Sequence, residues 1–142
     1  MEKIIHELNK LINKAIKNNE SPVAAIIVHN NKIIAKAYNQ RNKSNITTDH
    51  AEIIAIHKAN RRLKSWRTNK CTMYVTLEPC EMCKSVIKES RIENVYYFLP
   101  RNSEKKQYKG TKILSIDNTI ETTEKFIRNY KKIMHEFWEN KR

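Results

Sequence analysis

Apolar residues follow two different spacings along this 142-residue chain. Near its start they recur every three or four positions, which predicts an amphipathic helix over residues 2–18. Two short apolar, β-branched runs follow at 23–29 and 32–39, and the asparagine pair between them predicts a β-hairpin. Residues 40–49 are polar and predict a loop, after which helical spacing returns over 50–63.

The second half of the chain continues the alternation of strands and helices. The order helix–strand–strand–helix–strand–helix–strand–helix predicts a mixed α/β layered sandwich. No internal repeat or linker interrupts it, so we expect a single domain over residues 1–142. The predicted elements are a strand at 71–77, a helix at 79–90, a strand at 94–99, a basic loop at 100–110, a short segment at 111–115 and a final helix from Thr122 to Trp138.

Two of the predicted helices begin beside residues with chemical potential. Thr48 or Asp49 is available as N-cap of the second helix. Pro79 suits the first turn of the third helix, which places Cys80 and Cys83 in that turn.

Composition indicates an ordinary globular protein. Apolar residues make up 39% of the chain, and no run of 18 apolar residues predicts a transmembrane helix. The N-terminal segment carries charges at helical spacing and does not resemble a secretory signal, so we expect a cytoplasmic protein with no membrane partner. Thiols stay reduced in that compartment, and three cysteines are an odd number, which argues against a disulfide framework.

The chain is strongly basic, with 28 Lys and Arg residues against 15 acidic ones and a formal charge of +13. The excess is spread along the sequence and does not form a basic tail. One interpretation is a polyanionic partner such as RNA. The other is a compositional bias toward Lys, Asn and Ile, and charge alone leaves both open.

The segment "TLEPCEMCK" contains a C-x-x-C pair, which can serve as a disulfide, a redox couple, a structural metal clamp or part of a catalytic metal site. His50 supplies a third ligand of the kind that zinc prefers beside Cys80 and Cys83. Cys71 lies within an apolar strand, and no further Cys or His pair offers a fourth ligand. Three ligands leave one position open, which favours a catalytic zinc.

Glu52 follows His50 by two residues. On a regular helix these positions do not share a face, so the pair converges only if both project from the first turn. In that geometry the Glu52 carboxylate can act as general base toward a water on the metal and as general acid toward a leaving amine.

The compound pattern "HAE" at 50–52 and "PCEMC" at 79–83 is the signature of zinc nucleobase deaminases. Together with "PVAAIIVHNNKIIAKAYN" and "MYVTLEPCEMCKSVIKESRIENV", it resembles the bacterial tRNA-specific adenosine deaminases of the cytidine deaminase-like superfamily. The resemblance covers nearly the whole chain. It implies a three-layer α/β/α fold with a central mixed sheet, and conversion of adenosine to inosine at the wobble position of the tRNA anticodon arm.

The resemblance also implies a set of site residues and partners. It implies one zinc ion per subunit, a homodimer, and Glu52 as the proton shuttle. The implied residues are His50, Cys80 and Cys83 for zinc, Asn39, Ala51 and Leu77 for the target base, and Lys105, Lys106 and Lys109 for RNA contact in the basic loop.

Three features depart from the pattern of that family. Ala24 stands where glycine is usual and could narrow the pocket wall, and Asp49 precedes the histidine where a small residue is common. The family has small residues and then an Asp–x–Lys pattern after the fourth strand, whereas residues 98–110 here are "FLPRNSEKKQYKG". This last difference concerns substrate recognition and leaves the zinc motif unchanged.

Two other functions therefore remain open. One is a zinc-dependent deaminase of a free base or nucleoside such as guanine, cytosine or cytidine. The other is a non-catalytic, zinc-stabilised RNA-binding module. Glu52 argues against the second, because a purely structural metal site has no use for a proton shuttle.

Overall fold

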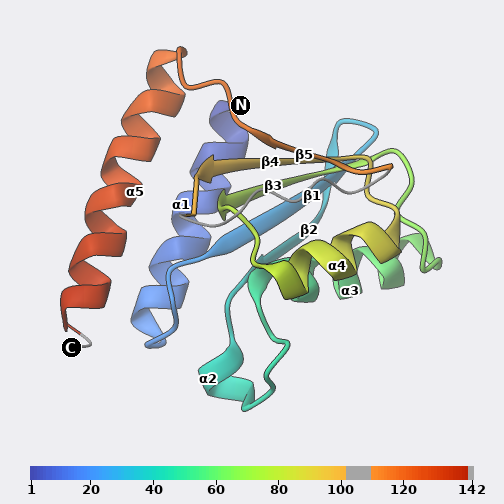
Figure 1. Cartoon of the computed structure of the whole chain (residues 1–142), viewed down its shortest axis with the longest axis horizontal. Helices are drawn as coiled ribbons and strands as arrows, with labels where there is room; N and C mark the ends of the chain where they lie inside the picture. Colours follow the sequence, from blue (N-terminus) through green and yellow to red (C-terminus); the bar gives the residue numbers. More distant parts are fainter. Residues whose placement is uncertain (102–109, 141–142) are drawn as a thin grey trace.

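The computed structural model describes residues 1–101 and 110–140 and has three layers (Figure 1). A five-stranded sheet lies in the middle, with α1 and α5 on one face and α3 and α4 on the other. The predicted three-layer α/β/α arrangement is thereby confirmed. The helices are α1 (Glu2–Lys17), α2 (Arg41–Ser44), α3 (Ala51–Leu63), α4 (Glu81–Ser90) and α5 (Glu121–Asn140).

The sheet is mixed, as expected, with strand order β2-β1-β3-β4-β5. Strand β1 pairs antiparallel with β2 and β3, while β3, at the centre of the sheet, β4 and β5 run parallel. Parallel neighbours need a crossover, and α4 supplies the one between β3 and β4. The strands are β1 (Ala24–His29), β2 (Lys32–Tyr38), β3 (Cys71–Leu77), β4 (Asn94–Leu99) and β5 (Lys112–Ser115).

The hairpin of β1 and β2 turns at Asn30 and Asn31, as the asparagine pair predicted. Both residues have positive φ, at 51° and 60°. A two-residue turn with both φ values positive matches the twist of the flanking strands, and asparagine tolerates this conformation better than most residues.

The core lies on both faces of the sheet. The apolar side of α1 is buried through Leu8 and Ile12, which packs this helix against β1 and β2. On the same face α5 places the ring of Phe126 edge-on against Phe98 of β4. On the opposite face α3 contacts β1, β2 and α4. None of the described helices is long and apolar enough to cross a membrane.

Three local expectations were wrong. The polar segment 40–49 contains the short helix α2, whose backbone N–H groups at Asn42 and Lys43 donate to the buried carboxylate of Glu20 at 3.0 and 2.8 Å. His50, rather than Thr48 or Asp49, is the N-cap of α3. The helix α4 begins at Glu81, so Pro79 precedes it. The segment at 111–115, for which the sequence predicted no element type, contains the parallel strand β5.

Candidate active site

The predicted metal ligands converge at one end of the sheet, where α3 and α4 begin. His50 is the N-cap of α3, Cys80 is the N-cap of α4, and Cys83 lies in the first turn of α4. Both caps have extended backbone angles, with ψ of 154° for His50 and 171° for Cys80. Because helix starts carry unpaired N–H groups and a positive dipole end, they favour thiolates.

The ligand atoms of these three residues all lie within 4.8 Å of one another. His50 Nδ1 is 3.4 Å from Cys83 Sγ and 3.7 Å from Cys80 Sγ. Two donors about 2.0–2.3 Å from a tetrahedral zinc are separated by roughly 3.5 Å, so these spacings fit zinc. Two sulfurs and one imidazole nitrogen are also the donor set that zinc prefers.

The protonation of these side chains prepares the site for a cation. The hydrogen bond from Cys83, with help from His50, lowers the pKa of Cys80 to about 3. The same contact and burial raise the pKa of Cys83, while the hydrogen bond with Cys80 raises that of His50. The lowered pKa favours the thiolate form of Cys80, and a metal would take the place of protons on Cys83 and His50.

Glu52 lies beside the three ligands in the first turn of α3 and is only 2% exposed. Burial raises the pKa of its carboxyl group. Its Oε1 atom has no hydrogen-bond partner among the described residues. A buried carboxylate oxygen is costly to leave unpaired, so this atom indicates that a donor belongs in the site. A water on the metal is such a donor, and the residues present therefore fit a catalytic zinc.

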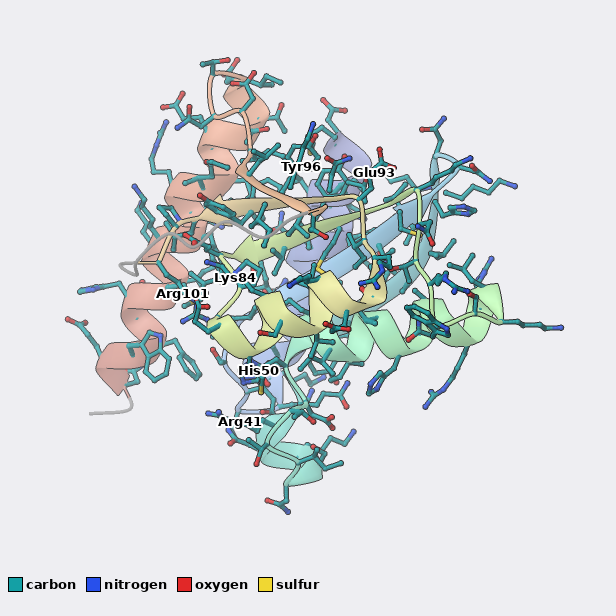
Figure 2. All side chains as sticks on the ribbon, turned by 45° about the vertical axis from the view of Figure 1, so that its right-hand side comes forward. Arg41, His50, Lys84, Glu93, Tyr96 and Arg101 are labelled. Atoms are coloured by element: carbon teal, nitrogen blue, oxygen red, sulfur yellow. The ribbon has the colours of Figure 1, made fainter. Side chains whose placement is uncertain are left out.

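His50, Glu52 and Cys80 line a cavity of about 210 Å³ that opens to solvent. Figure 2 shows His50 between Arg41 and Arg101, which also line this cavity. Its lining residues are Ser21, Val23, Asn39, Arg41, His50, Ala51, Glu52, Cys80, Arg101 and Trp138.

The residues predicted to contact the target base have different positions. Asn39 and Ala51 line the cavity, and Asn39 Oδ1 accepts the backbone N–H of Arg41 at 3.1 Å. Leu77 ends β3 and is not among the lining residues. Ala24 is buried at the start of β1 and does not line the cavity either. The contact of Leu77 with substrate stays a prediction.

The predicted RNA contacts Lys105, Lys106 and Lys109 lie outside the described residues. Cys71, which the sequence placed in a strand, is buried at the start of β3 and apart from the metal-ligand group. Sequence motifs missed five lining residues, which come from four separate segments and share no pattern. They are Ser21, Val23, Arg41, Arg101 and Trp138.

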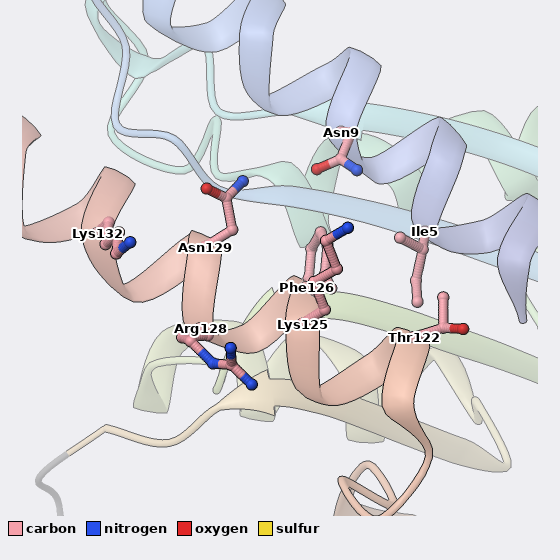
Figure 3. A pocket seen from close by; sticks show the side chains of 8 residues that line it. All are labelled: Ile5, Asn9, Thr122, Lys125, Phe126, Arg128, Asn129 and Lys132. Carbon is pink, nitrogen blue, oxygen red and sulfur yellow. The ribbon is translucent and has the colours of Figure 1, made fainter.

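A second hollow, of about 370 Å³, lies between α1 and α5 (Figure 3). Ile5 and Phe126 form its apolar part, and Lys125, Arg128 and Lys132 lie around it. Among the described residues, no cysteine, histidine or carboxylate lines it. Metal-dependent chemistry therefore belongs to the cavity at the helix starts and not to this hollow.

A Cys–Cys–His metal site with a buried glutamate, set at the helix starts of an α/β/α sandwich, defines a zinc-dependent deaminase domain. Residues 1–99 match the family described as "Cytidine and deoxycytidylate deaminase zinc-binding region". The chain belongs to this family.

Similar proteins include several tRNA deaminases. The tRNA-specific adenosine deaminase of Buchnera aphidicola is 37% identical over 131 residues, which are 90% of this chain and 87% of that protein. Its counterpart in Bacillus subtilis is 40% identical over 96 residues, 68% of this chain. The chain spans 60% of the length of the Bacillus protein, and 7% of the chloroplastic tRNA(adenine(34)) deaminase of Arabidopsis thaliana, to which it is 42% identical.

Solved structures with the same fold include two kinds of deaminase. One comes from studies of A-to-I editing by tRNA:A34 deaminases, with a TM-score of 0.72, 28% identity and coverage of 81% of this chain and 98% of that chain. The other is a guanine deaminase from Bacillus subtilis, with a TM-score of 0.66, 32% identity and coverage of 70% of this chain and 64% of that chain.

Proposed function

We propose that this protein is a zinc-dependent hydrolase that converts adenosine to inosine at the wobble position of tRNA. The observation that carries the chemistry is the unpaired, buried Glu52 Oε1 beside the His50, Cys80 and Cys83 donor set. The likeness to the tRNA-specific adenosine deaminase of Buchnera aphidicola along 90% of the chain supports the substrate. The strongly basic composition is compatible with a polyanion.

The proposed reaction replaces the exocyclic amine of adenine with oxygen from water and releases ammonia. A zinc ion held by His50, Cys80 and Cys83 would supply an activated water at neutral pH. Glu52 accepts a proton from the water at its carboxylate and passes it to a ring nitrogen, then takes the proton of the newly added hydroxyl group and passes it to the departing amine. Its burial keeps the carboxylate out of bulk solvent, so the proton stays within the site.

The cavity residues orient the base during these transfers. Asn39 follows β2 and Ala51 opens α3, so both are fixed by secondary structure next to Glu52. We propose that Asn39, the backbone near Ala51 and the end of β3 at Leu77 hydrogen-bond the target base. A cavity of about 210 Å³ has room for one nucleobase, which must leave its stack to enter.

Several finer assignments belong to the same proposal. They are one zinc ion per subunit, a homodimer, a cytoplasmic location, and RNA contact by Lys105, Lys106 and Lys109 on the anticodon arm. Metal analysis of purified protein measures the stoichiometry, and light scattering measures the mass in solution. A mass of one chain would contradict the homodimer.

The direct test incubates purified, zinc-loaded protein with unmodified anticodon stem-loops and detects inosine by sequencing. We expect inosine at the wobble position and nowhere else in the loop. The likeness to a guanine deaminase makes a free base the second candidate. Release of ammonia from guanine or cytosine, with no inosine in RNA, would reject the tRNA assignment in its favour.

A further inference from the structure

Arg101 lies at the mouth of the active-site cavity, where two hydrogen bonds to Glu78 hold it. It follows β4 by two residues and lines the same cavity as His50 and Glu52. Its backbone N–H donates to Glu78 Oε1 at 3.2 Å, and its Nε donates to the backbone carbonyl of Glu78 at 2.6 Å. The side chain is thus anchored at its Nε to the residue that follows β3.

The carboxylate of Glu78 has a different cation as its partner. Lys84 Nζ lies 3.1 Å from Glu78 Oε2, and both side chains are only 3% exposed. Lys84 also lies 3.8 Å from Glu81. Figure 2 shows Lys84 and Arg101 near this end of the sheet. Because Lys84 neutralises Glu78, the guanidinium of Arg101 is not needed to balance that buried charge.

The guanidinium therefore keeps its binding capacity for another group. Among the described residues no hydrogen bond or ion pair engages its Nη atoms, and the residue is exposed. A guanidinium fixed through Nε still presents its terminal N–H groups, which match the oxygens of a phosphate. Arg41 lines the same cavity and adds positive charge, while the carboxylate there, Glu52, is buried.

We propose that Arg101 binds a phosphate adjacent to the target nucleoside and so selects nucleotides over free bases at this active site. This inference rests on the proposed function for the identity of the base. A cavity of about 210 Å³ takes in a base, so the sugar and its phosphates stay at the mouth where Arg101 lies. The phosphate belongs to an RNA diester or to a free mononucleotide, and the test separates these sources.

The test measures binding separately from catalysis. Dissociation constants of an anticodon stem-loop are measured by fluorescence anisotropy at several salt concentrations. The proteins compared are the wild type, Arg101→Ala, Arg101→Lys and the control Arg62→Ala. The control removes another exposed arginine, near the far end of α3. Arg101→Ala keeps the backbone N–H that Glu78 accepts, and its thermal unfolding is compared with that of the wild type.

We expect Arg101→Ala to weaken binding about 10-fold at moderate salt and to reduce the slope of log K against log salt by about 1. Arg101→Lys should give an intermediate value, because a lysine keeps the charge but lacks the planar fork. Two stem-loops carry a neutral methylphosphonate, one at the linkage 5′ of the target nucleotide and one at the linkage 3′ of it. We expect one of the two to bind the wild type more weakly than the unmodified stem-loop does. The same modification should not change the affinity for Arg101→Ala.

The binding of adenosine 5′-monophosphate to the wild type and to Arg101→Ala is also compared. Equal responses of the two proteins to both neutral linkages, together with equal affinities for adenosine 5′-monophosphate, would overturn the proposal. If Arg101→Ala weakens only the binding of adenosine 5′-monophosphate, the phosphate belongs to a free mononucleotide. Because inosine is measured separately, Arg101-dependent RNA binding without inosine would contradict only the proposed function. Inosine formation by a protein whose binding of the stem-loop and of adenosine 5′-monophosphate does not depend on Arg101 would contradict only this inference.

Discussion

Glu52 reaches the metal ligands because the residue before its helix is not helical. His50 has ψ of 154°, so its side chain leaves the helical path that would otherwise separate positions i and i+2. The carboxylate from the first turn of α3 can then share a site with an imidazole two residues earlier. The spacing of His50 and Glu52 required them to converge at the helix start, and the extended backbone of the N-cap residue allows this.

Replacing Glu52 with glutamine tests its role as proton shuttle. Glutamine has nearly the same shape but cannot accept and return a proton, so we expect Glu52→Gln to lower kcat by about 10²–10⁴-fold. Zinc content measured on the same preparation should not change, because Glu52 is not one of the ligand group. Inosine formation at the wild-type rate by the zinc-loaded variant would exclude this role.

The site residues that the sequence predicted differ in residue type and spacing from those that it did not predict. His50, Cys80 and Cys83 have side chains whose chemistry limits their uses, and their spacing identifies them. Arg101 and Trp138 are surface residue types with many uses. They reach the cavity only because β4 and α5 end beside it, which is a tertiary fact. Only the atypical loop sequence at 98–110 marked the region of Arg101 in advance.

At the scale of elements, Tyr130 connects α5 to the sheet next to the active site. Its hydroxyl donates to the carbonyl of Pro22 at 2.8 Å and accepts from Thr76 Oγ1 at 3.0 Å. Thr76 Oγ1 in turn accepts the backbone N–H of Ala24 at 3.1 Å. This buried chain of hydrogen bonds joins α5 to the start of β1 and to the end of β3. It also fixes the part of α5 that precedes Trp138 in the cavity.

Replacing Tyr130 with phenylalanine should break this connection at little cost in packing. The Pro22 carbonyl loses its donor and Thr76 loses its acceptor in a buried place, so we expect a loss of about 1–3 kcal/mol in the free energy of unfolding. Urea denaturation measures the difference. The matched control is Tyr96→Phe, whose ring stacks on Tyr74 and whose hydroxyl makes no hydrogen bond among the described residues. Equal losses in the two variants would show that the network contributes nothing specific.

The elements themselves were largely predictable, because apolar spacing determines which faces can be buried. The helix α1 and the strands β1 to β4 lie within a residue or two of their predicted bounds. The short helix α2 was not predictable, since its N–H groups are satisfied by Glu20, more than twenty residues before its end. A cap from so far upstream leaves no local signal, and a four-residue helix has no periodicity to detect.

For the whole molecule, the metal site and the core make separate contributions to stability. The core contains buried residues from α1, α3, α4, α5 and the strands, and it does not depend on the metal ligands. The ligands join only the starts of α3 and α4, which already contact each other in the same layer. The protein should therefore stay folded when the metal is removed, unlike small zinc domains that unfold without it.

Chelation should lower the thermal stability without loss of secondary structure. A ligand present at about 100 times its Kd stabilises the folded state by roughly 2.7 kcal/mol. For a chain of this size, we expect its removal to lower Tm by about 5–10 °C. Differential scanning fluorimetry with and without a zinc chelator measures the shift, and far-UV circular dichroism at 25 °C should show unchanged helix content. His50→Ala, which lacks one ligand, should start with a lower Tm and respond less to the chelator. If complete zinc removal leaves the wild-type Tm unchanged, the His50, Cys80 and Cys83 group does not couple metal binding to the fold.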